Sequence, residues 1–209
     1  MKEKLINGLK WFYKSFIWLF IVLLGLDILT KQLVMHSGVT APGIIMDWKI
    51  VRISYVLNPN AAFGLGASNP TVSRIVYLIV ASLITIGVLF YLIYKRKTTK
   101  LYIRACLVLV VTGAIGNMID RIFYANTDYC VVDWIDFYWI WNYNFNIADC
   151  CVVIAAFMLA IYIILQEVKD YRSKPKVKVT QEKVLSKTEK ERLENEQKQA
   201  EEVKQDEEK

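Results

Sequence analysis

The stretch IVYLIVASLITIGVLFYLIY, residues 75–94, carries no charge and decides the fold class. Its length matches the roughly 20 apolar residues that a helix needs to cross a bilayer. Hydrophobic residues make up 55% of the 209-residue chain, a high share for a water-soluble domain. Three more stretches, 16–29, 101–119 and 150–165, are nearly as apolar. The sequence predicts an all-α integral membrane protein with four transmembrane helices, at about 11–33, 73–94, 101–122 and 147–167.

The first apolar stretch follows several lysines, as the apolar region of a secretory signal peptide does. Asp27 and Lys31 stand where a signal peptide would have its small-residue cleavage site. We therefore interpret this segment as a helix that the protein retains.

Lysine and arginine are concentrated before the first predicted helix, between the second and third, and after the fourth. The intervening segments at about 34–72 and 123–146 are poor in both. This bias predicts that both termini are cytoplasmic and that those two loops are extracytoplasmic. The net charge of +6 is then a topology signal that also attracts anionic membrane lipid, and it requires no nucleic-acid partner.

Two segments outside the helices have a distinctive composition. Residues 44–57 are rich in Ile, Val, Tyr and Trp and predict one or two short strands in a small extracytoplasmic β region. Residues 134–143 are crowded with Trp and Tyr, which favour the membrane interface. The sequence divides into a membrane domain, 1–167, and a charged, disordered cytoplasmic tail, 168–209, that has too few apolar side chains to form a core.

The chain contains four cysteines and a single histidine, His36. The cysteine spacing fits neither a disulfide framework nor a metal site, and one histidine gives little support to a Ser–His pair or a histidine-ligated metal. We expect no metal and no other cofactor.

The unusual polar residues converge when they are placed on this topology. Each falls at the extracytoplasmic end of a predicted helix or in an extracytoplasmic loop: Asp27, Lys31, Asn58, Asn117, Asp120, Arg121, Asp133, Asn146 and Asp149. One explanation is that interhelical polar pairs only hold the bundle together, and this remains open for Asp27 with Lys31 and for Asp120 with Arg121.

Asp133 and Asp149 flank one aromatic segment and are harder to explain as structural pairs. Ionising two neighbouring carboxyl groups in a partly desolvated site has a high free-energy cost, so such a pair shares one proton and can activate water. Asp149 lies at the start of the fourth predicted helix, where the helix dipole favours an anion, and we expect it to be the ionised member.

Five phrases, in this order and on these four helices, resemble the lipoprotein signal peptidases (signal peptidase II). They are DILTK at 27–31, NPNAAFG at 58–64, GNMIDR at 116–121, VVD at 131–133 and FNIAD at 145–149. The resemblance covers about residues 11–167. The chain departs from the family at Asn60, where the second phrase usually has glycine.

The resemblance implies a multi-pass aspartic endopeptidase of the bacterial cytoplasmic membrane. Such enzymes remove the signal peptide from a prolipoprotein, cutting before a diacylglyceryl-modified cysteine. It further implies catalysis by Asp133 and Asp149 near the outer face. The substrate-binding or supporting residues it implies are Asp27, Lys31, Asn58, Asn117, Asp120, Arg121 and Asn146. We expect the partners to be modified prolipoproteins and membrane lipid, and the enzyme to be a monomer.

The main alternative is a small ion or proton transporter, because intramembrane carboxylates also mark proton relays. Transporters usually place such residues near the bilayer midplane and often contain internal repeats. Here the polar residues gather at one face and no repeat is visible. A non-catalytic relative with a degenerate site would lack one of the two aspartates, and both are present.

Overall fold

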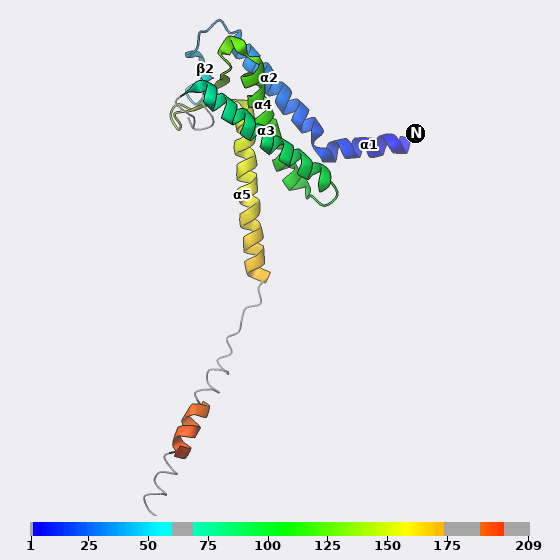
Figure 1. Ribbon diagram of the computed structural model, residues 1–209, viewed down its shortest axis with the longest axis vertical. Coiled ribbons are helices and arrows are strands. Elements are labelled where there is room, and N and C mark those ends of the chain that lie inside the picture. Colours follow the sequence, from blue (N-terminus) through cyan, green and yellow to red (C-terminus); the bar gives the residue numbers. More distant parts are fainter. Residues whose placement is uncertain (1, 60–68, 174–188, 199–209) are drawn as a thin grey trace, which may run out of the picture. The chain divides into compact units, whose positions relative to one another are not determined.

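The computed structural model describes residues 2–59, 69–173 and 189–198. Helices form most of these: α1 (Lys2–Ser15), α2 (Ile17–Met35), α3 (Pro70–Tyr94), α4 (Leu101–Phe123) and α5 (Ile147–Ser173) (Figure 1). Within the described residues, α2 to α5 are the four helices long and apolar enough to cross a membrane. The prediction of four transmembrane helices is confirmed at this level.

The predicted helix at 11–33 is two helices in the structure. Phe16 has φ 60°, a left-handed conformation that a right-handed helix cannot continue through. Residues up to Ser15 therefore belong to α1, which leaves the start of α2 at an angle (Figure 1). The prediction missed this break because Phe16 begins an apolar run and is not a Gly, Asn or Asp, the residues that usually adopt this conformation.

Helix α3 starts at Pro70, three residues before the predicted start at 73. The Asn69 side chain accepts hydrogen bonds from the backbone N–H groups of Thr71, at 2.9 Å, and Val72, at 3.4 Å. Pro70 occupies the first turn, where no backbone donor is needed.

Helix α4 is the most buried of the four long helices, and both α2 and α3 pack against it. Leu109 of α4 forms a core cluster with Cys151 and Ala155 of α5. A Cβ at Gly113 would collide with the Ala148 carbonyl oxygen and a Val152 methyl group. Glycine therefore permits the close approach of α4 to the start of α5.

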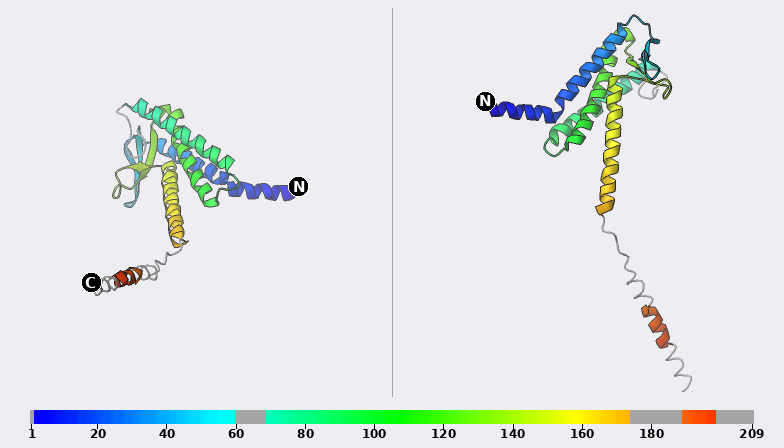
Figure 2. Two further views of the ribbon diagram at one scale, coloured as in Figure 1. Left: turned by 60° about the horizontal axis from the view of Figure 1, so that its bottom comes forward. Right: turned by 180° about the vertical axis from the view of Figure 1, so that it is seen from behind.

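Four short strands form one antiparallel sheet in the order β1 (Gly43–Asp47), β2 (Arg52–Asn58), β3 (Val131–Asp136) and β4 (Asn144–Phe145). The sheet lies beside the start of α5 (Figure 2). β1 and β2 confirm the strands predicted at 44–57. The sequence analysis had placed Asp133 in a loop, and this was wrong: it lies in β3, opposite Val56 of β2. Its partner strand comes from far away in the sequence, which local patterns do not reveal.

The chain divides into two units, residues 1–163 and 164–209. In the second unit, α5 continues to Ser173, past the predicted end at 167. Four of the six residues from Glu167 to Arg172 are charged, but Glu, Lys and Arg are good helix formers, so the helix can extend beyond its apolar part. Residues 189–198 are also helical. The rest of the predicted tail, and Asn60, lie outside the described residues.

The contact at Gly113 gives a prediction about stability. Gly113→Ala should lower the free energy of unfolding by about 1–3 kcal/mol, because the new methyl group overpacks the α4–α5 contact. Gly87→Ala is the matched control, since a Cβ at Gly87 in α3 meets nothing within 4 Å. Thermal unfolding in detergent measures both, and equal melting temperatures would contradict the proposed packing.

Candidate active site

A cavity of about 350 Å³ lies between α3, α4, α5 and the sheet. Asp133 and Asp149 both line it, with Asn58, Asn117 and Arg121. Much of the remaining wall is apolar and comes from the helices: Val80, Ala81 and Ile84 of α3, Val110 and Ala114 of α4, and Val152, Val153 and Ala156 of α5. The sheet and the connection between β3 and β4 add Val131, Trp141, Tyr143, Asn144 and Phe145. The cavity thus joins a polar wall with two carboxylates to an apolar channel between helices.

Asp133 is held by the strand pairing of β2 and β3. Asn58 pairs with Val131, so Asp133, two residues further along β3, is its diagonal neighbour on the same face. The Asn58 amide donates to Asp133 Oδ2 at 3.0 Å. The residue is only 2% exposed, and its other oxygen accepts from Asn146 Nδ2 at 2.8 Å.

Asp149 is held by the start of α5. Asn146 Oδ1 accepts from the Asp149 backbone N–H at 2.9 Å, while the Asn146 N–H donates to Asp149 Oδ2 at 3.2 Å. This reciprocal pair is a capping box, which caps the helix and fixes the carboxylate in its first turn. Asn117 Nδ2 donates to the other oxygen of Asp149 at 2.7 Å.

Two asparagines connect the aspartates. Asn146 is fully buried and contacts both of them, Asp133 through its side-chain amide and Asp149 through the capping box. Asn117 bonds to Asp149, and its Oδ1 accepts from Asn146 Nδ2 at 3.1 Å. The orientation of each aspartate is therefore fixed in part by an asparagine from another element: Asn58 of β2 for Asp133, and Asn117 of α4 for Asp149.

Lys31 lies behind these asparagines and is fully buried. Its Nζ lies 2.8 Å from Asp27 Oδ2 and 2.9 Å from Asp120 Oδ2, and it donates to Asn117 Oδ1 at 3.1 Å. An ammonium group has three N–H donors, so these three partners match its capacity. The predicted pair of Asp27 and Lys31 is confirmed, and Asp120 joins it from α4.

The two carboxylates that neutralise Lys31 also connect other elements. Asp27 Oδ1 accepts the Ala148 backbone N–H at 2.9 Å and so ties α2 to the first turn of α5. Asp120 Oδ2 accepts the Val132 N–H at 3.1 Å and ties α4 to β3. The network around Lys31 therefore fixes the two elements that carry Asp133 and Asp149.

Arg121 is 3% exposed and lies in the cavity wall. Its Nη1 donates to the Asn117 carbonyl at 3.2 Å, and its guanidinium carbon lies 3.9 Å from the centre of the Tyr77 ring. A guanidinium over an aromatic face is a favourable cation–π arrangement. The sequence analysis missed Tyr77, because a tyrosine near the end of an apolar helix is also typical of the membrane interface.

The environment of Asp133 favours its protonated form. Burial, followed by the neighbouring Asp149 carboxylate, raises the pKa of Asp133 to about 8, although Asn58, Lys31 and Asn146 oppose the rise. One carboxyl group protonated at neutral pH beside a second carboxyl group is an arrangement that can donate one proton and accept another.

All nine residues singled out in the sequence belong to this site. Asn58, Asp133, Asn146, Asp149, Asn117, Lys31, Asp27 and Asp120 form one chain of hydrogen bonds and ion pairs, and Arg121 joins it through the Asn117 backbone. Sequence reasoning did not find the backbone groups of Ala148 and Val132 that the buried carboxylates use.

The Lys31 network gives a second prediction. Lys31→Met should lower the free energy of unfolding by about 3–5 kcal/mol, because it leaves Asp27 and Asp120 buried without their cation. Lys10→Met, on the exposed surface of α1, removes the same charge and should change stability little. Thermal unfolding of both proteins in one detergent measures the difference. A Lys31 variant as stable as the Lys10 variant would show that the network does not hold the elements together.

Comparisons with known proteins identify the family of this chain. Residues 19–165 match the family model described as signal peptidase (SPase) II. Proteins named lipoprotein signal peptidase are similar to this chain. The protein of Clostridioides difficile is 38% identical, and the match covers 74% of this chain and 98% of the relative. The protein of Symbiobacterium thermophilum is 37% identical, and the match covers 71% of this chain and 93% of the relative.

The fold is also similar to solved structures. Two, each described as a bacterial membrane enzyme, superpose with TM-scores of 0.60 and 0.58 at 23% identity. The first superposition covers 78% of this chain and 93% of the solved chain, and the second covers 70% of this chain and 90% of the solved chain. The family model and the relatives together show that this chain belongs to the signal peptidase II family of membrane peptidases.

Proposed function

We propose that this protein is an intramembrane aspartic endopeptidase that removes the signal peptide from bacterial prolipoproteins, cutting before the diacylglyceryl-modified cysteine. The observation that carries the proposal is that Asp133 and Asp149 line one cavity and are both bonded to Asn146. The names of the relatives support the same substrate class.

The reaction needs one acid and one base. Asp149 acts as the base, because two N–H donors and the positive end of the α5 dipole stabilise its anion. It takes a proton from water, whose oxygen attacks the scissile carbonyl carbon. Asp133 gives its proton to the carbonyl oxygen. Collapse of the tetrahedral intermediate then breaks the C–N bond. The proton held by Asp149 passes to the leaving nitrogen, and one hydroxyl proton of the intermediate returns to Asp133, which restores the starting state without a metal or organic cofactor.

The cavity walls suggest how substrate is held. The apolar side chains of α3, α4 and α5 suit an apolar signal segment that enters laterally from the bilayer. Arg121 can donate several hydrogen bonds to the carbonyl groups of an extended substrate backbone. Asp27, Lys31 and Asp120 support the site without facing the cavity, and Asn58, Asn117 and Asn146 orient the two aspartates.

The charge bias supports a placement in the bilayer. With both termini cytoplasmic, the sheet and the two aspartates lie near the outer face of the bacterial cytoplasmic membrane. Residues 1–167 then form the peptidase domain, and the charged segment from residue 168 onward, which begins with the last turns of α5, is cytoplasmic. We infer a monomer that works on modified prolipoproteins within membrane lipid and binds no nucleic acid. Family membership leaves the ion- or proton-transport hypothesis without support.

Removing either aspartate tests the mechanism. Asp133→Asn and Asp149→Asn should each lower the cleavage rate by about 10²–10⁴-fold or more, because an amide can neither accept the proton from water nor donate one as an acid. The assay compares purified variants in detergent on a diacylglyceryl-modified prolipoprotein and on its unmodified form, and only the modified form should be cut.

Asp136→Asn is the matched control, because Asp136 lies in the same strand as Asp133 but does not line the cavity. It should cleave at a normal rate. Near-normal turnover by a folded Asp133 or Asp149 variant would refute the aspartic mechanism, and equal cleavage of the unmodified form would refute the substrate class.

The raised pKa of Asp133 predicts the alkaline limit of activity. Cleavage should fall as pH rises through about 8, because Asp133 then loses the proton that it must donate. Asn58 stabilises the Asp133 anion, so Asn58→Ala should move this limit to higher pH. A pH profile of kcat/KM measures the limit. A shift to lower pH, or an unchanged limit, would contradict the assigned role of Asp133.

A further inference from the structure

A second cavity lies at the opposite end of the helices from the two aspartates. Its volume is about 740 Å³, within the range of about 300–1,000 Å³ that small-molecule sites occupy. It is bounded by the end of α1, the start of α2, the end of α3 with the connection that follows it, and α4 from Arg104 to Ile115. It shares no lining residue with the cavity that holds Asp133 and Asp149.

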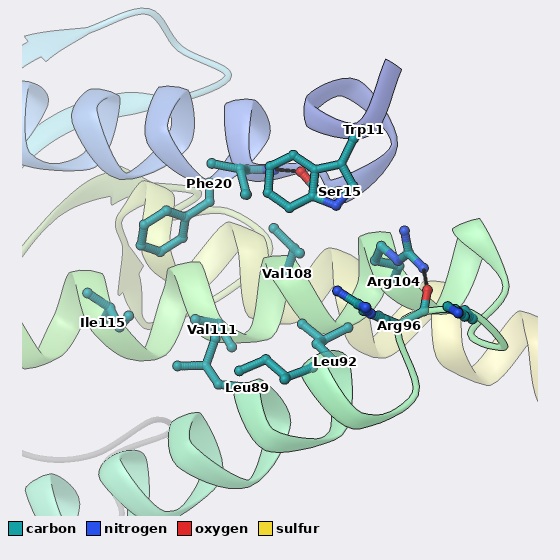
Figure 3. Close-up of a pocket in the computed structure, with 13 residues that line it drawn as sticks. Trp11, Ser15, Phe20, Leu89, Leu92, Arg96, Arg104, Val108, Val111 and Ile115 are labelled. Carbon is teal, nitrogen blue, oxygen red and sulfur yellow. Dashed lines mark hydrogen bonds between the residues drawn. The ribbon is translucent and has the colours of Figure 1, made fainter. Parts of the chain in front are cut away.

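Most of its wall is apolar. Figure 3 shows Phe20 of α2, Leu89 and Leu92 of α3, and Val108, Val111 and Ile115 of α4 along the cavity. From Arg104 to Ile115, α4 rises roughly 16 Å at 1.5 Å per residue. The cavity therefore extends along a membrane helix and is apolar from Val108 to Ile115, and an extended hydrocarbon chain fits such a shape better than a compact solute does.

Three cations line the other end of this cavity: Arg96, Lys97 and Arg104. Arg104 is held in place, since its Nη1 donates to the Lys14 carbonyl at 3.0 Å. Its Nη2 donates to the Arg96 carbonyl at 2.6 Å, as Figure 3 shows. Both acceptors are neutral. The ion pairs found among the described residues involve none of these three side chains. The mouth of the cavity therefore carries positive charge that the described part of the chain does not neutralise.

An apolar channel with cations at one end complements an amphiphile with an anionic head. We propose that this cavity binds an anionic glycerophospholipid, whose phosphate contacts Arg96, Lys97 and Arg104 and whose acyl chain lies along α4. Basic pockets between transmembrane helices bind anionic head groups in this way. The proposal needs only a helix bundle in a membrane and does not rest on the peptidase mechanism.

The test uses the full-length protein in a neutral detergent, with lipid binding followed by native mass spectrometry. The probes are phosphatidylglycerol and phosphatidylcholine with the same acyl chains, and glycerol 3-phosphate as the free head group. Wild type should bind phosphatidylglycerol more tightly than phosphatidylcholine, and glycerol 3-phosphate should not compete. Arg96→Gln/Lys97→Gln should weaken phosphatidylglycerol binding by about tenfold or more.

Lys95→Gln/Lys100→Gln is the matched control. It removes two charges from the same connection between α3 and α4, yet neither residue lines the cavity. It should change binding by less than about twofold. Equal binding of the two lipids, or equal losses in the two double variants, would overturn the proposal. Competition by glycerol 3-phosphate would indicate a site for free phosphate compounds and would overturn it too.

A second measurement locates the acyl chain. Trp11 lines the cavity, so phosphatidylglycerol with brominated acyl chains should quench its fluorescence. The quenched intensity should be smaller in Trp11→Phe than in wild type. Identical quenching in the two proteins would place the chain elsewhere on the membrane surface and contradict the proposed cavity.

Discussion

The structure depends on one buried ammonium group. Lys31 is fully enclosed and contacts Asp27, Asp120 and Asn117 at 2.8–3.1 Å. Burying a charge costs several kcal/mol unless its partners are well placed, so the two carboxylates and the amide must be in position for the helices to close around it. Those carboxylates then accept backbone N–H groups from α5 and β3. A single cation thereby ties α2 and α4 to the elements that carry the site.

Asp133 and Asp149 come from different kinds of structure, a strand and a helix terminus. Their relation is set by Asn146, which caps α5 and also donates to Asp133. Fixed donors of this kind cost no reorganisation during a reaction, which is what electrostatic catalysis requires. In the proposed mechanism, the polar network behind the aspartates positions the two carboxylates, and the apolar part of the cavity receives the signal segment of the substrate.

Short sequence patterns predicted the features that depend on residues close together in the chain, such as the helices and the side chains that share one helical face. The apolar run at 75–94 indicated a spanning helix because the bilayer fixes its length, and the spacing of Asp27 and Lys31 placed them on one helical face. The same approach failed where the structure depends on distant contacts or on single dihedral angles. β3 exists because β2 pairs with it, and the break at Phe16 comes from one left-handed residue in an apolar run. The site residues were identified, but the ties from Asp27 to Ala148 and from Asp120 to Val132 use backbone groups, which carry no sequence signal.

The central claim is that Asp133 and Asp149 hold one proton between them at neutral pH. Infrared difference spectroscopy of protein with ¹³C-labelled aspartate measures this directly, because protonated and ionised carboxyl groups absorb at different frequencies. The account predicts one protonated carboxyl signal at pH 7 that disappears as pH rises through about 8 and is absent from the Asp133→Asn protein. A spectrum in which both groups are already ionised at pH 6, or a signal that persists unchanged in the Asp133→Asn protein, would contradict it.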